Sequence, residues 1–212
     1  MHNYYYIPAK KFSSREIREL LISVIALTFA FSFAFSDIMY TRDVRRFIYI
    51  LPVSFAAVST AFLLHELGHK IVAQKYGCWA EYRMYPRGLL LALIVSFFGV
   101  VFAAPGAVYI TGNVDSERNG KISAAGPLTN ILIALVFLPF VLFLNPSFIW
   151  FLCAFVCLIN IILGGFNMIP FPPLDGSKIF RWSKMVWAGM LIIIVMLGVT
   201  IYPYYALIFS YL

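Results

Sequence analysis

The chain has 212 residues, of which 62% are hydrophobic and 12% are charged, and its net charge is +7. Soluble domains carry about twice that share of charged residues. The composition therefore excludes an ordinary soluble protein and indicates an all-α polytopic membrane protein with a single transmembrane domain over residues 1–212. In such a protein an excess of basic residues reports orientation in the lipid bilayer. The sequence has no patch of aromatic and basic residues of the kind that would indicate binding to RNA or DNA.

Long apolar runs predict about five membrane-spanning helices, at residues 20–39, 47–76, 122–144, 148–167 and 185–212. The first run could instead belong to a secretory signal peptide, because Ala34, Phe35 and Ser36 loosely fit a cleavage site. Its length favours an uncleaved spanning helix. The last run contains Pro203 and suffices for one tilted or kinked crossing.

A small β element is expected between the second and third spanning helices. Residues 79–86 alternate in the manner of a strand, and residues 107–111 form a second candidate strand. The apolar segment 88–104 between them is short, and a polar loop follows at residues 112–121. Segment 88–104 is therefore expected to enter the membrane and return, or to lie on its surface as a hairpin.

The three cysteines provide no disulfide framework. Cys153 and Cys157 lie four residues apart in an apolar run, where free cysteine behaves as a small hydrophobic residue. Cys78 closely follows the second predicted helix and is a weaker candidate for a metal ligand.

The segment from His65 to His69, with Glu66 between them, lies near the end of the second predicted helix. Residues four apart on a helix share one face, one turn above the other. Two imidazoles with this spacing can hold one metal ion, with a carboxylate beside them. The alternative is a pair of membrane histidines that hydrogen-bond neighbouring helices, but ionisable groups at membrane depth are costly and usually functional.

A catalytic zinc usually has three protein ligands and one open position. His2 lies far away in a polar tail, and Glu66 is the usual general base in this pattern. Asp175 is the best remaining candidate for the third ligand, since it lies in a proline-rich segment directly after a spanning helix. Non-helical backbone near membrane depth is tolerated where it lines a cavity. Asp175 could also cap the helix that begins near Gly176, and both roles could hold together.

The candidate ligands constrain the topology, because His65 and Asp175 can share a metal only on one side of the membrane. Helices 122–144 and 148–167 cross twice and return the chain to its starting side, so segment 88–104 must not cross. With this topology 13 of the 16 Lys and Arg residues lie on one side. The other three are Arg42, Arg45 and Arg46. The positive-inside rule makes the first side cytoplasmic, with the N-terminus and the opening of the site, in a multi-pass protein of the cell membrane.

Two segments together resemble the site-2 protease family of intramembrane zinc metalloproteases. They are the segment from His65 to His69 and the segment from Asn167 to Gly176, which reads Asn-Met-Ile-Pro-Phe-Pro-Pro-Leu-Asp-Gly. The segment Gly126-Pro127-Leu128-Thr129-Asn130 is similar to an element at the start of an intervening helix in that family. The resemblance covers about residues 47–181, the catalytic core.

The resemblance implies one zinc ion per chain, held by His65, His69 and Asp175, with Glu66 as the general base. It implies that Asn167 contacts the substrate or the transition state. It also implies cleavage of a locally unwound peptide bond in or near a transmembrane segment of a membrane protein. A substrate of this kind could add as a strand to the edge of residues 79–86.

The chain departs from the family in two ways. It has no visible PDZ or CBS domain, and its C-terminal run allows one crossing where some members use more helices to gate substrate entry. The alternative function is non-proteolytic metal binding or metal transport. A transporter usually has inverted repeats and several coordinating sites, and neither is visible in the sequence.

Overall fold

The computed structural model of the protein describes residues 12–101 and 104–212, so His2, Lys10 and Lys11 lie outside the described residues. Within these ranges five helices are long and apolar enough to cross a membrane, as the sequence predicts. They are α1 (Ser14–Ser36), the continuous helix Val44–Lys75, α6 (Ser116–Phe143), α7 (Phe148–Asn167) and the C-terminal helix Lys184–Ser210. The short helices are α2 (Ile38–Thr41), α5 (Pro86–Ser96) and α8 (Asp175–Trp182).

Two of the long helices change their winding along their length. The helix Val44–Lys75 comprises α3 (Val44–Val58), a π-helical turn (Ser59–Leu63) and α4 (Leu64–Lys75). The C-terminal helix comprises α9 (Lys184–Ile201), a 3-10 turn (Tyr202–Tyr204) and α10 (Tyr205–Ser210). The 3-10 turn contains Pro203, which lacks an N–H and so interrupts the α-helical hydrogen bonds, as expected for a kinked crossing.

Polar caps make two helices begin earlier than their apolar runs. The side chains of Ser13 and Asp115 accept hydrogen bonds from the backbone N–H groups of Glu16 (3.1 Å) and Arg118 (2.8 Å). These bonds satisfy donors that a helix start leaves without a partner. Helix α1 therefore begins before residue 20, and residues 116–121, expected in a loop, form the first turns of α6.

The strands β1 (Trp79–Met84) and β2 (Gly106–Thr111) form an antiparallel pair in which Tyr82 lies opposite Val108. Helix α5 lies between them in the chain. Its 11 residues span only about 16 Å, which is too short to cross a bilayer. Strand β1 is shorter than the expected strand 79–86, because Pro86 is the first residue of α5. The shortness of α5 agrees with the expectation that the element between the second and third spanning helices does not cross.

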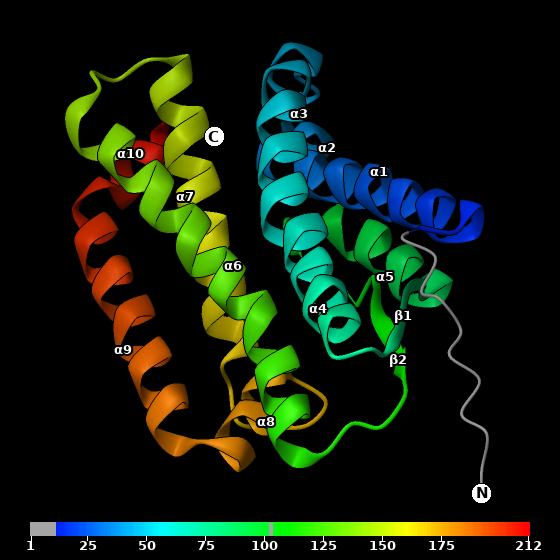
Figure 1. The fold of residues 1–212 in the computed structure, drawn as a ribbon. Coiled ribbons are helices and arrows are strands. Elements are labelled where there is room, and N and C mark those ends of the chain that lie inside the picture. The colour runs from blue at the N-terminus through cyan, green and yellow to red at the C-terminus, as the bar shows by residue number, and fades with distance from the viewer. Residues whose placement is uncertain (1–11, 102–103) are drawn as a thin grey trace, which may run out of the picture.

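Figure 1 shows how the elements surround the region of the candidate site. Helices α6 and α7 run side by side with α9 beyond them, and α4 lies between α6 and the two-stranded sheet. The largest buried cluster lies among α3, α6, α7 and α9 and includes Ile50, Trp150, Phe151 and Ile194. Helix α8, the end of α4 and the starts of α6 and α9 lie toward the lower end of the view, as does the sheet.

Helix α1 holds the outer edge of β1 with two glutamates. The carboxylate of Glu16 accepts the backbone N–H of Tyr82 (2.9 Å), and that of Glu19 accepts the backbone N–H of Met84 (3.0 Å). Glu16 also forms a buried ion pair with Lys70 of α4. Because these donors are already paired, the expectation that a substrate strand adds along residues 79–86 is wrong for this edge.

Candidate metal centre

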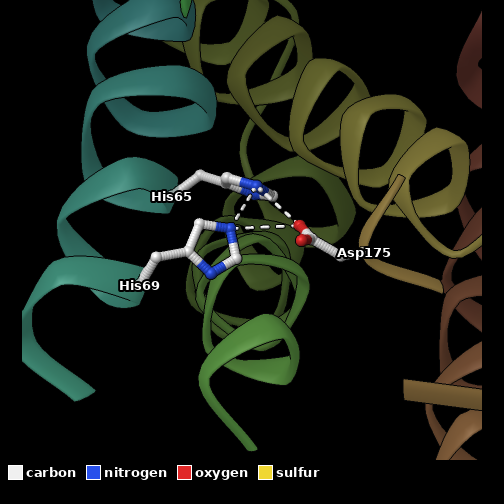
Figure 2. A group of neighbouring side chains, drawn as sticks. All are labelled: His65, His69 and Asp175. Atoms are coloured by element: carbon white, nitrogen blue, oxygen red, sulfur yellow. Dashed lines mark hydrogen bonds and ion pairs between the residues drawn. The ribbon is translucent and has the colours of Figure 1, made fainter. Parts of the chain in front are cut away.

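Helices α4 and α8 bring His65, His69 and Asp175 together, although Asp175 lies more than 100 residues further along the chain. The two Nε2 atoms are 3.1 Å apart, and Oδ2 of Asp175 lies 3.4 Å from Nε2 of His65 and 3.0 Å from Nε2 of His69 (Figure 2). All three residues are at most 8% exposed. These are the three residues that the sequence analysis expects as metal ligands.

The spacing of these atoms fits a zinc ion. Ligand atoms about 2.0–2.2 Å from one tetrahedral zinc lie about 3.3–3.6 Å from one another, close to the separations found here. Helix α6 leaves room beside them at Gly126, where a Cβ atom would lie 2.4 Å from Nε2 of His69 and 2.6 Å from Nε2 of His65. Two imidazoles and a carboxylate are also a donor set that zinc accepts.

The far nitrogen of each imidazole is also engaged. Nδ1 of His69 donates to the backbone carbonyl of Ile122 over 2.8 Å, since a carbonyl can only accept, and Nδ1 of His65 lies 2.6 Å from Oδ1 of Asn130. Such bonds fix the ring orientation and leave Nε2 with a free lone pair. Sequence reasoning did not assign a role to Asn130, although its spacing from Ile122 and Gly126 places all three on one face of α6.

Asp175 points at the histidines rather than capping its own helix. The N-cap position of α8 falls on Leu174, which makes no side-chain cap, and Asp175 is the first helical residue. Its carboxylate faces the histidines and also lies 3.5 Å from Nζ of Lys178. Burial alone would raise the pKa of Asp175, but the adjacent His69 and His65 hold that pKa well below its usual range. The capping alternative is therefore not what the structure shows.

The start of α8 is held tightly against the end of α7. A Cβ atom on Gly176 would lie 2.3 Å from the carbonyl oxygen of Met168, so only glycine fits at this position. The same carbonyl accepts a 2.7 Å hydrogen bond from Nε1 of Trp187 on α9. These contacts place Asp175 opposite α4.

Glu66 lies on α4 beside the ligand pair and faces the sheet. It is half-buried, and its Oε2 accepts the backbone N–H of Val108 in β2 over 3.1 Å. The strand hydrogen-bonded to Glu66 is therefore β2, while α1 is hydrogen-bonded to β1.

Asn167 is half-buried and ends α7. Among the residues that the structure describes, the one hydrogen bond of its side chain runs from Nδ2 to the carbonyl of Leu163 in the same helix (3.0 Å), so Asn167 is not hydrogen-bonded to the ligand residues. Cys78 packs in an apolar cluster with Ala73, Ala80 and Ile122 and does not belong to the group of candidate metal ligands. Cys153 and Cys157 are buried in the apolar interior, as expected.

Comparison with known proteins identifies several relatives, which match this chain over different shares of their own length. A Methanocaldococcus jannaschii protein provisionally named zinc metalloprotease MJ0611 is 43% identical over 181 residues, which cover 84% of this chain and 90% of the relative. Zinc metalloprotease MJ0392 of the same organism is 34% identical over 130 residues, which are 61% of this chain and 33% of the relative. A Bacillus subtilis protein provisionally named zinc metalloprotease YwhC is 26% identical over 162 residues, or 64% of this chain and 73% of the relative.

No family model and no solved structure matches the chain. The relatives share the name zinc metalloprotease, and the imidazoles of His65 and His69 with the carboxylate of Asp175 are ligands that zinc accepts. The names and the ligands therefore both indicate zinc. The first relative is similar over nearly the whole of both chains, so the similarity is not confined to a short motif. The chain belongs to the site-2 protease family of zinc metalloproteases.

Proposed function

We propose that the protein is an intramembrane zinc metalloprotease that hydrolyses a peptide bond in or near a transmembrane segment of membrane-protein substrates. The observation that carries the proposal is the group formed by His65, His69 and Asp175, with Glu66 next to it on α4. Helix α4 belongs to one of five helices that are long and apolar enough to span a membrane. A hydrolytic centre on such a helix suits a substrate that is itself in the bilayer.

The residues of the site would divide the work of peptide hydrolysis. A zinc ion held by His65, His69 and Asp175 would supply the Lewis acidity that lowers the pKa of water and polarises a peptide carbonyl. Glu66 would take the proton from the attacking water and deliver it to the leaving amine. The N–H of Val108 supports this role, since it holds the Glu66 carboxylate between α4 and β2.

A helical substrate hides its carbonyls in hydrogen bonds, so it must be extended before cleavage. The outer edge of β2 is the better place for an extended substrate to pair, because α1 pairs two N–H groups at the outer edge of β1 through Glu16 and Glu19, whereas Glu66 pairs one N–H group, that of Val108, at the edge of β2. The bond from Val108 to Glu66 puts this edge next to the proposed general base. Oδ1 of Asn167, which accepts no hydrogen bond from the residues that the structure describes, is the proposed polar contact to the substrate.

In the expected topology 13 Lys and Arg residues lie on one side of the membrane and three, Arg42, Arg45 and Arg46, lie on the other. This asymmetry supports a cytoplasmic location for the N-terminus and for the opening of the site. The protein would then be a multi-pass protein of the cell membrane. Its catalytic core would extend over about residues 47–181 within a single transmembrane domain.

Cleavage of transmembrane peptides by the purified, zinc-loaded protein tests the proposal. The Glu66→Gln variant should keep its fold and its zinc, because glutamine preserves size and one acceptor. It should cleave about 10²- to 10⁴-fold more slowly, which is the usual contribution of general acid–base catalysis. The matched control is Glu117→Gln on the exposed start of α6, which should cleave like the wild type.

Two outcomes would contradict the proposal. Cleavage that survives Glu66→Gln unchanged would remove Glu66 from the mechanism. Zinc uptake into sealed vesicles by wild-type protein that cleaves none of several transmembrane peptides would favour metal transport instead.

A further inference from the structure

A chain of buried amides leads from His65 across two other helices. Asn130 of α6 and Asn160 of α7 are both fully buried, and Nδ2 of Asn130 lies 3.0 Å from Oδ1 of Asn160. Asn160 in turn contacts Thr60 in the π-helical turn that precedes His65. Buried polar groups are costly unless they are hydrogen-bonded, and both amides have a hydrogen-bond partner for their nitrogen and for their oxygen.

The direction of each hydrogen bond in this series of amides follows from the last bond, between Asn160 and Val156. Asn160 lies 2.9 Å from the backbone carbonyl of Val156, which can only accept, so the amide atom facing it must be Nδ2. The same Nδ2 donates to Oγ1 of Thr60 over 3.0 Å. Oδ1 of Asn160 must therefore face Asn130 as an acceptor.

The same reasoning continues to the imidazole. The atom of Asn130 that faces Asn160 must be Nδ2, which also donates to the carbonyl of Ala61 over 2.9 Å. Oδ1 of Asn130 is then left to accept from Nδ1 of His65 (2.6 Å). A proton on Nδ1 leaves the lone pair on Nε2, the atom that faces Asp175 and His69.

We propose that Asn160, which is fully buried and hydrogen-bonds to Asn130 instead of the metal-binding group, is a positioning residue for zinc: it orients Asn130, and Asn130 orients His65. Ala61 supplies one acceptor for the amide nitrogen of Asn130, and Asn160 supplies the second. Without Asn160, one N–H of Asn130 would be buried without a partner, and the amide would turn away from His65 to satisfy it. The proposal rests on the zinc site of the proposed function.

A double-mutant cycle on zinc affinity tests the proposal, with affinity measured by chelator competition on the purified protein. Outer-shell partners of metal-bound histidine usually contribute about 10- to 100-fold in affinity. We expect Asn160→Leu to weaken binding about tenfold and Asn130→Leu at least as much. If Asn160 acts through Asn130, adding Asn160→Leu to Asn130→Leu should weaken binding no further. An unchanged affinity in Asn160→Leu, or an equal further loss in the double variant, would overturn the proposal.

Two more variants separate positioning from packing. Asn160→Asp introduces a carboxyl group that, in its neutral form, can donate to Val156 and still accept from Asn130. It should bind zinc within about threefold of the wild type, and a loss as large as that of Asn160→Leu would overturn the proposal. Cys157→Ala is the packing control, since Cys157 is buried on the same helix and contacts the carbonyl of Ala134 instead of the amide chain. It should leave zinc affinity unchanged.

Histidine labelling gives an independent readout, since the chain has only three histidines. In ¹⁵N-histidine spectra of zinc-free protein, the wild type and Asn160→Asp should carry the Nδ1 proton on His65, and Asn160→Leu should give a mixture of tautomers. Identical spectra in all three would count against the proposal. If the wild type binds no zinc, the proposed function fails and this proposal with it. If the wild type binds zinc and the Asn160 variants bind equally well, only the positioning role is lost.

Discussion

Gly126 is the residue of α6 that faces both ligand nitrogens. Its missing side chain matters because a Cβ atom there would lie within 2.6 Å of Nε2 on both His65 and His69. At Gly126 the backbone of α6 passes beside the histidines, and no side chain fills the space next to their Nε2 atoms. A metal ion with an open position for water needs that space.

We expect Gly126→Ala to weaken zinc binding by at least about tenfold, as much as the loss of an outer-shell partner of a ligand. The added methyl group would displace the imidazoles, while alanine remains a good helix former. Chelator competition measures the effect. The matched control is Gly189→Ala on α9, where a Cβ atom would meet no atom within 4 Å. Equal zinc affinity in the two variants would show that the space beside Gly126 is not needed for the metal.

At the residue scale, the sequence predicts best what depends on short spacing. His65, Glu66 and His69 are recognisable because four residues make one helical turn. Asp175 is reached by excluding other ligands, and its place beside the histidines is a tertiary contact. Asn130 escaped prediction because its bond to His65 joins residues 65 positions apart. Neither propensity nor periodicity contains information about such a pair.

At the scale of elements, the small sheet is held by carboxylates on both of its edges. Glu16 and Glu19 of α1 accept N–H groups of β1, and Glu66 of α4 accepts an N–H group of β2. A two-stranded sheet is marginally stable by itself, so these helices define its position. The buried pair of Glu16 and Lys70 ties α1 to the helix that carries the histidines.

We expect Glu16→Gln to destabilise the protein by about 3–5 kcal/mol, because it leaves Lys70 buried without its opposite charge. Thermal or denaturant unfolding in detergent micelles measures the change. The double variant Glu16→Gln with Lys70→Met should recover much of the loss, since the unpaired charge is then gone. Glu117→Gln, in an exposed pair with Lys121, should change stability little. A single variant as stable as the wild type would show that the buried pair does not hold α1 in place.

The sequence predicts the spanning helices better than their ends. Long apolar runs locate all five, because hydropathy is a local property. The start of α6 lies inside a polar segment, where Asp115 caps it, and hydropathy cannot detect such a start. The docking of α1 on β1 joins Glu16 to Tyr82, and this tertiary contact overturned the expected substrate edge.

At the scale of the whole molecule, a metal ion shared by α4 and α8 would require that segment 88–104 not cross the membrane. Helix α5 agrees, since its 11 residues are too few. The antiparallel pairing of β1 with β2 also brings the end of this segment back beside its start, with Thr111 opposite Trp79. The distribution of basic residues then gives the sidedness that we propose.

Cysteine labelling in a variant without the native thiols tests this topology. We expect cysteines at positions 115 and 178 to react from the cytoplasmic side, and a cysteine at position 45 to react from the other side. The expectation follows from the basic residues gathered on one side and from the shared metal. Reaction of position 115 from outside, with position 178 reacting from inside, would contradict the non-crossing assignment of segment 88–104.

The most direct test of the central claim is the zinc content of the purified protein, measured per chain for the wild type and for Asp175→Ala. If His65, His69 and Asp175 form one centre, the wild type should hold about one zinc and Asp175→Ala should lose most of it. Asp43→Ala makes the same change at the N-cap of α3 and should retain the wild-type zinc content. Full zinc occupancy in Asp175→Ala would contradict the account, because the third ligand would then lie elsewhere.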